Sequence, residues 1–208
     1  MYQAILWAGE EKKVDIIVMP LGFSQWHEVI REAIDAIDKR IIIFAAAANW
    51  GGLDQVAFPA RMKDVLCLFS TNPLNKSSRD LNPPLNPRKA HNFAILGEGV
   101  QIPASLGSPS RVINGTSIST AIAAGLAGSL LDFSRQPICR DCLRNVKGRD
   151  EISAIFEDLS KDYLDGGYNC IAPWSLLRNI RADNREKQRM EIRDHLLWVL
   201  QEYFKGCS

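Results

Sequence analysis

A serine between a threonine and an isoleucine opens a small-residue segment in INGTSISTAIAAG, from Ile113 to Gly125. If a helix begins here, the Ser117 hydroxyl lies near backbone N–H groups that have no partner inside the helix. The positive end of the helix dipole then favours negative charge that develops beside it. These conditions suit a serine nucleophile. Serine is also a good N-cap residue, so this stretch alone leaves a purely structural role open.

The segments around this serine predict a layered α/β domain. VDIIVM, RIIIFAAAAN and DVLCLFST are continuous apolar runs, which is typical of parallel strands buried on both faces. Apolar residues recur at three- and four-residue steps from Trp26 to Ile37, which predicts an amphipathic helix. HNFAILGEGV predicts a further strand, and residues 117–133 a tightly packed helix. Residues 72–89, rich in Pro, Asn and Ser, predict an exposed loop. We therefore expect a parallel sheet with helices on both faces.

The composition changes after Gln136. The remaining residues are more charged, and their apolar positions follow helical spacing, as in Ile152, Ile155, Phe156 and Leu159. We expect two parts, an α/β domain over residues 1–136 and a helical C-terminal extension over residues 137–208. A loop is expected around DGGYNCIAPW.

The bulk properties exclude some classes of partner. The 208 residues carry a net charge of +1, so we expect no nucleic acid partner. No apolar run approaches a membrane span, so we expect no membrane partner. Five cysteines without a signal peptide favour reduced thiols and a cytoplasmic or intracellular setting. The pair Cys139 and Cys142, in CRDC, is more typical of connector thiols than of a zinc site, and we expect no metal and no cofactor.

Three separated stretches resemble the subtilisin-like serine proteases, or subtilases. VDIIVMPLG resembles the family strand that ends in Ser-Leu-Gly. IIIFAAAANWGG, followed by VAFPARMKDVLCLFST, resembles the Ala-Ala-Gly-Asn strand and the Tyr-Pro-Ala segment after it. NGTSISTAIAAG resembles the Gly-Thr-Ser nucleophile motif. The matches occur in family order from about Tyr2 to Phe133. They correspond to the C-terminal part of the catalytic domain, and the chain is also similar to fungal intracellular subtilase-like domains.

The resemblance implies a role for individual residues. Ser117 would be the nucleophile, and Asn49 would donate its side-chain amide to the oxyanion together with the Ser117 N–H. An extended peptide substrate would pair with the backbone at Leu21 and Gly22. The positions implied to bind substrate are Leu21, Gly22, Ala46, Ala47, Ala48 and Thr116.

Three positions depart from the family pattern. Ala48 replaces the glycine before the oxyanion asparagine, and its methyl group narrows the expected specificity pocket. Pro20 replaces the serine of Ser-Leu-Gly; it lacks an N–H but keeps its carbonyl as an acceptor. Ala121 replaces a proline after the nucleophile, and alanine suits a helix better.

The Asp and His motifs of the family are absent from this chain. In subtilases both precede the strand that VDIIVMPLG resembles, and here only about one helix precedes it. His27, His91 and His195 all follow that strand, and none has a His-Gly-Thr context. We therefore do not expect any of them to be the general base. A sheet that lacks its first strands is also expected to expose an edge and an apolar face.

The leading hypothesis is a serine endopeptidase domain that is inactive alone and acts on a peptide or protein substrate. Its Asp and His would come from an upstream segment, a separate chain or another part of a larger protein. The alternative is a pseudoprotease that retains the peptide groove as a binding module. An α/β esterase is a weaker hypothesis, because INGTSIS lacks the G-x-S-x-G elbow.

Overall fold

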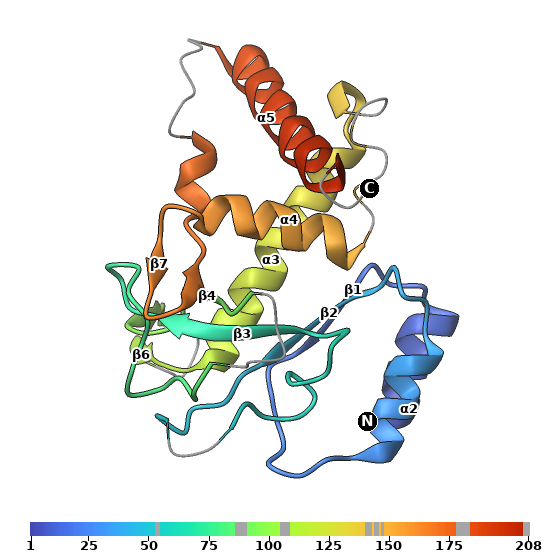
Figure 1. Cartoon of the computed structure of the whole chain (residues 1–208), viewed down its shortest axis with the longest axis vertical. Helices are drawn as coiled ribbons and strands as arrows, with labels where there is room; N and C mark the ends of the chain where they lie inside the picture. The colour runs from blue at the N-terminus through green and yellow to red at the C-terminus, as the bar shows by residue number, and fades with distance from the viewer. Residues whose placement is uncertain are drawn as a thin grey trace.

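A six-stranded sheet runs through the molecule (Figure 1). The computed structural model describes residues 1–52, 55–85, 91–104, 109–139, 143, 146, 148–177 and 184–205. The strands, in spatial order, are β1 (Ile16–Met19), β2 (Ile42–Ala46), β3 (Leu66–Thr71), β4 (Phe93–Leu96), β8 (Tyr168–Cys170) and β7 (Leu164–Asp165). From β1 to β8 in this order, each strand runs parallel to the next, and only the last pair, β8 with β7, is antiparallel. A separate two-stranded sheet pairs β5 (Val100–Ile102) with β6 (Arg111–Ile113).

The pleat of each central strand divides its side chains between two hydrophobic cores. On β2, Ile42 and Phe44 lie in one core, whereas Ile43 and Ala45 lie in the other. Alternation of this kind follows from the two-residue period of a strand. Because both faces of β2 are covered, its residues form a continuous apolar run.

Helices cover both faces of the sheet (Figure 1). On one face lie α1 (Tyr2–Leu6), its π-helical continuation at Trp7–Glu11, and α2 (Glu28–Ala36). On the other face lie α3 (Thr116–Arg135) and α4 (Arg149–Ser160), with α5 (Arg185–Lys205) against α4. Short 3-10 turns occur at Pro137–Cys139 and Pro173–Leu177. The predicted α/β class with a helical C-terminal part is confirmed.

The C-terminal part also contributes to the sheet. Residues predicted as a loop form the β7–β8 hairpin, whose turn contains Gly166 and Gly167 at φ +61° and +90°. These backbone conformations suit glycine, which has no Cβ. β8 pairs with β4, and α4 shares a core with α3. The residues on either side of position 136 thus share one sheet and one core, and the division into two domains stays a prediction.

Two local predictions need correction. The segment from residue 72 is not a wholly exposed loop, because Ser78 and Asn82 are buried and hydrogen-bonded to Ser70. Secondly, α3 is long and apolar enough to cross a membrane by length and composition, a property that core helices of soluble proteins share.

One edge of the sheet is open on the side of β1. Within the described residues, β1 pairs with β2 alone, and no strand lies on its other side. Val18 is 40% exposed, and Ile16 and Ile17 are half-buried. The molecule thus presents the unpaired edge that the sequence predicted.

Candidate active site

The predicted nucleophile lies where the carboxyl end of the sheet meets the first turn of α3. Ser117 is the second residue of that helix and is partly exposed. Its Oγ donates a hydrogen bond to the carbonyl oxygen of Pro20, just beyond β1, at 2.8 Å. The sequence predicted that the Pro20 carbonyl remains available as a hydrogen-bond acceptor. In the structure it accepts the hydrogen bond from the Ser117 hydroxyl.

The predicted oxyanion donor is fixed beside this serine. Asn49 follows β2, and its Oδ1 accepts a hydrogen bond from the backbone N–H of Thr116 at 2.8 Å. Because the carbonyl side of the amide is committed to this bond, the Nδ2 group remains as the donor. The structure therefore brings Asn49 and Ser117 to the same helix N-terminus.

Thr116 orients the loop that carries Asn49. Its Oγ1 accepts a hydrogen bond from the backbone N–H of Ala48 at 3.3 Å. Ala48 has φ +130°, a conformation that L-residues rarely adopt and that glycine adopts without strain. The side chain and the backbone of Thr116 thus hold two consecutive residues, Ala48 and Asn49.

Two glycines, neither of which the sequence pattern alone assigned a structural role, allow this close packing. Gly115, the N-cap of α3, has φ +145°, and a Cβ there would lie 3.1 Å from Asn49 Nδ2. A Cβ on Gly97 would lie 2.0 Å from the Oγ of Ser119, so no side chain fits. The available signals were the glycines of LGEG and NGTS, next to a strand and a helix start.

The predicted substrate-binding positions fall into two groups. Leu21 is 37% exposed and Gly22 is exposed, so both backbones are accessible beside the serine. A Cβ on Gly22 would lie 2.4 Å from that of Ala57, so this position requires glycine. Ala46 and Ala47 are buried, and of the three alanines in this wall only Ala48 is partly exposed. Their role in a specificity pocket stays a prediction.

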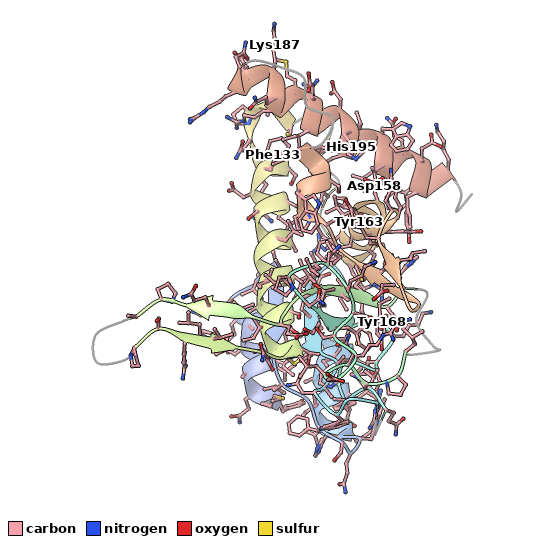
Figure 2. All side chains as sticks on the ribbon, turned by 90° about the vertical axis from the view of Figure 1, so that its left-hand side faces the viewer. Phe133, Asp158, Tyr163, Tyr168, Lys187 and His195 are labelled. Atoms are coloured by element: carbon pink, nitrogen blue, oxygen red, sulfur yellow. The ribbon has the colours of Figure 1, made fainter. Side chains whose placement is uncertain are left out.

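The three histidines contact other groups. His27 packs its ring against Phe23, with 4.5 Å between centroids. His91 Nε2 lies 3.3 Å from a carboxylate oxygen of Glu157. His195 Nε2 lies 2.8 Å from Asp158 Oδ2, between α5 and α4 (Figure 2). The Ser117 hydroxyl hydrogen-bonds a backbone carbonyl, which cannot take its proton.

The described cysteines are structural in character. Cys67, Cys139 and Cys170 are buried. Burial raises the pKa of the Cys170 thiol to about 11, which keeps it protonated and a poor nucleophile at neutral pH. Cys142 and Cys207 lie outside the described residues, so the predicted character of the CRDC pair is untested.

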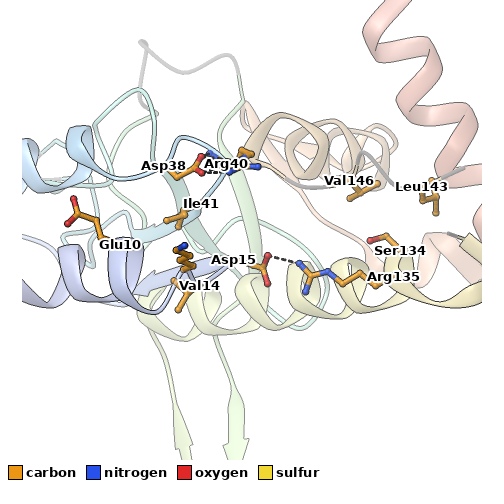
Figure 3. A pocket seen from close by; sticks show the side chains of 12 residues that line it. Glu10, Val14, Asp15, Asp38, Arg40, Ile41, Ser134, Arg135, Leu143 and Val146 are labelled. Carbon is orange, nitrogen blue, oxygen red and sulfur yellow. Dashed lines mark hydrogen bonds and ion pairs between the residues drawn. The ribbon is translucent and has the colours of Figure 1, made fainter. Parts of the chain in front are cut away.

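A cavity of about 780 Å³ lies at the opposite end of α3 from Ser117 (Figure 3). Four of its charged side chains form ion pairs, Arg135 with Asp15 and Arg40 with Asp38. It is open at the amino ends of β1 and β2, whereas ligands of parallel sheets bind at the carboxyl ends. We therefore place the candidate active site at Ser117 and not in this cavity.

Solved structures show which class of fold this is. The chain is 18% identical to the prenylagaramide maturation protease PagA, with a TM-score of 0.63, over 82% of this chain and 62% of that one. It is 20% identical to the S218A mutant of the PatA protease domain, with a TM-score of 0.62, over 85% and 64%. It is 15% identical to the patellamide maturation protease PatG, with a TM-score of 0.64, over 92% of this chain and 55% of that one. The fold is thus that of subtilisin-like proteases, and the chain spans less than two thirds of these three structures.

The sequence profile of the subtilase family matches residues 1–146. The chain belongs to the subtilase family. No curated protein matches the sequence. The correspondence to the C-terminal part of the catalytic domain and the likeness to fungal intracellular domains stay predictions.

Proposed function

We propose that this chain supplies the nucleophile and the oxyanion site of a serine endopeptidase. The observation that carries the proposal is the fixed pair of Ser117, at the N-terminus of α3, and Asn49, held by the Thr116 N–H. In acyl transfer the serine hydroxyl accepts the acyl group, and a preoriented amide and a helix N-terminus stabilise the negative charge on the carbonyl oxygen.

The chain's own residues account for half of the reaction. Ser117 Oγ attacks the carbonyl carbon of the scissile peptide bond, and negative charge develops on the carbonyl oxygen. The Asn49 amide and the Ser117 backbone N–H stabilise that charge, and the α3 dipole favours it. The C–N bond then breaks as the base that took the Ser117 proton returns it to the leaving amine, and an acyl group stays on Ser117 until water releases it. The Leu21–Gly22 backbone aligns the acyl half of the substrate by strand addition.

The proton of Ser117 must leave to a base from another segment. In the present arrangement the hydroxyl is bonded to the Pro20 carbonyl, which orients the serine without activating it. The open edge of β1 ends next to Pro20. We place a base-bearing Asp and His segment on this edge, where a parallel strand would finish beside Ser117 and cover the exposed part of α3. Without that segment the chain is inactive.

Cleavage of fluorescein-labelled casein, an unfolded protein, tests this function. The chain is assayed alone and joined to the residues encoded before Met1. We expect hydrolysis by the joined form and none by the chain alone, with Ser117→Ala abolishing it. Asn49→Ala should lower turnover about 10²- to 10³-fold, a range that itself comes from a subtilisin. Equal turnover of the Ser117→Ala and unmodified joined proteins would refute the proposal.

A second candidate function is a peptide-binding module without catalysis. It is favoured by one observation, that the Ser117 hydroxyl is bonded to a carbonyl while all three histidines contact other groups. A joined protein that folds and binds casein but neither cleaves it nor depends on Ser117 would support this function.

A further inference from the structure

A buried polar cluster lies at the carboxyl end of β3, and the proposed reaction does not use it. Asn82 and Ser78 are 3% and 4% exposed, and Ser70, the fifth residue of β3, is fully buried. Asparagine and serine are mostly exposed in proteins, and burial without hydrogen bonds costs free energy. Such a cluster persists only where its members are hydrogen-bonded.

The side chain of Asn82 bonds to both backbone groups of Ser70. Its Oδ1 accepts a hydrogen bond from the Ser70 N–H at 2.7 Å, and its Nδ2 donates one to the Ser70 carbonyl at 2.8 Å. The pairing of β3 with β2 ends at Leu68, two residues earlier. Asn82 therefore satisfies backbone groups that the neighbouring strand no longer reaches.

The chain from Ser78 to Asn82 forms a turn that is fixed to β3 at both ends. The N–H groups of Leu81 and Asn82 donate to the Ser78 carbonyl at 3.0 and 2.8 Å, and the Ser78 N–H donates to the Ser70 carbonyl at 2.9 Å. The hydroxyl groups of Ser70 and Ser78 are also hydrogen-bonded, at 3.0 Å. Because both ends are held by Ser70, the peptide groups between them are held in place.

This turn contacts the loop that carries Asn49. The Gly51 N–H donates to the Leu81 carbonyl at 3.2 Å. A Cβ on Gly51 would lie 2.5 Å from the carbonyl oxygen of Asp80, so the two backbones touch and the position requires glycine. The turn is thus in direct contact with the backbone two residues beyond Asn49.

The loop depends on outside contacts to hold Asn49 in one direction. Asn49 is exposed, and after Trp50 come Gly51 and Gly52, both with positive φ, a stretch of backbone with wide conformational freedom. Thr116 holds the loop on one side, through its bond to the Asn49 side chain. The turn of residues 78–82 holds it on the other side, at Gly51.

We propose that Asn82 is a positioning residue for the oxyanion site. It holds the turn of residues 78–82 against Gly51, and the held loop keeps the Asn49 amide directed at the developing negative charge. The inference rests on the proposed function for the role that it gives to Asn49. Asn82 itself touches no substrate, so its whole effect on turnover passes through Asn49.

Hydrogen exchange of single backbone amides, measured by NMR on the whole chain, tests whether Asn82 holds the loop. The Gly51 N–H reports the contact with the turn, and the Thr116 N–H reports the bond to Asn49. We expect Asn82→Ala to speed exchange at both amides about tenfold, which corresponds to about 1.4 kcal/mol, comparable with the loss of one buried hydrogen bond.

Leu159→Ala is the control for a mere loss of stability. It removes a buried leucine on α4 and destabilises the core away from the loop. It should leave exchange at Gly51 and Thr116 nearly unchanged, because amides in such loops exchange through local opening.

Turnover of casein by the joined protein separates positioning from a structural role. Asn82→Ala should lower kcat about tenfold with KM unchanged, because the oxyanion contact strengthens in the transition state. In an Asn49→Ala background the same change should lower kcat no further. Asn82→Asp keeps the acceptor for the Ser70 N–H and loses the donor to the Ser70 carbonyl. It should fall between Asn82→Ala and the unmodified protein in both measurements, and it replaces the alanine variant if that variant does not fold.

The outcomes distinguish this inference from the proposed function. Unchanged exchange at Gly51 and Thr116 in a folded Asn82 variant, or a rise that Leu159→Ala matches, would overturn the inference, whether or not the joined protein cleaves casein. Faster exchange in the Asn82 variants alone supports it, even if the joined protein is inactive and the proposed function falls. In an active joined protein, equal losses of kcat with and without Asn49 would also overturn it.

Discussion

At the scale of single residues, the site depends on backbone conformations that side chains do not tolerate. Gly115 provides the turn into α3 at φ +145°, and it leaves room for the Asn49 amide. Thr116 then fixes that amide through its N–H, and Ser117 follows in sequence. Three consecutive residues thus provide the turn, the residue that holds the Asn49 amide and the proposed nucleophile.

Gly115→Ala should strain this turn and displace Asn49. We expect a loss of about 1–3 kcal/mol in the free energy of unfolding, because a Cβ is placed in a sparsely populated backbone region. Gly125→Ala is the matched control on α3, where a Cβ meets open space. It should stabilise the chain by about 0.5–1 kcal/mol. Chemical denaturation measures both, and equal effects would contradict this account of Gly115.

At the scale of elements, α5 is attached to the body partly through a hydrogen bond between His195 and Asp158. Asp158 on α4 receives hydrogen bonds from His195 at 2.8 Å and from Lys161 at 2.7 Å. Burial by itself would raise the pKa of the Asp158 carboxyl, but the bonds from His195 and Lys161 outweigh burial and lower the pKa. Figure 2 shows Asp158 and His195 where the two helices meet.

The lowered pKa of Asp158 makes stability depend on pH in a defined direction. A carboxyl with a depressed folded-state pKa stabilises the fold above its ordinary pKa of about 3.9 and loses this contribution as pH falls through the folded value. Asp158→Asn should be less stable at pH 7 by about 1 kcal/mol, and its stability should fall less steeply in acid. Denaturation curves across acidic pH measure this, and parallel curves for the two proteins would contradict it.

At the scale of the whole molecule, the main feature is the open β1 edge of the sheet. Natural sheets protect free edges with charges, bulges or covering segments, because unpaired edges associate. Here the edge carries Ile16, Ile17 and Val18, none of them charged. We propose that the base-bearing segment pairs with this edge, and we expect the free edge to associate with a second copy of the chain.

Val18→Lys should reduce self-association of the chain by placing a charge on the exposed part of this edge. Sedimentation velocity over a range of concentrations should show a larger monomer fraction than in the unmodified chain. Val29→Lys, on α2, is the control and should behave like the unmodified chain. If both chains are monomeric throughout, the edge does not associate.

Much of the fold and of the site was predictable because the signals are local. Continuous apolar runs indicated β1, β2 and β3, and short motifs indicated Ser117 and Asn49. The strand β8 was not predictable, since three residues carry little pattern and its place depends on pairing with β4. The bond from Ser117 to Pro20 joins residues 97 positions apart, and only the folded sheet brings them together.

The most direct test of the central claim is labelling with a fluorophosphonate, which reacts with activated serines, followed by location of the label by peptide mass. The chain is treated alone and joined to the residues encoded before Met1, with Ser117→Ala as the control. Our account predicts a label on Ser117 in the joined form only. A folded joined form that stays unlabelled, or a label that persists in Ser117→Ala, would contradict it.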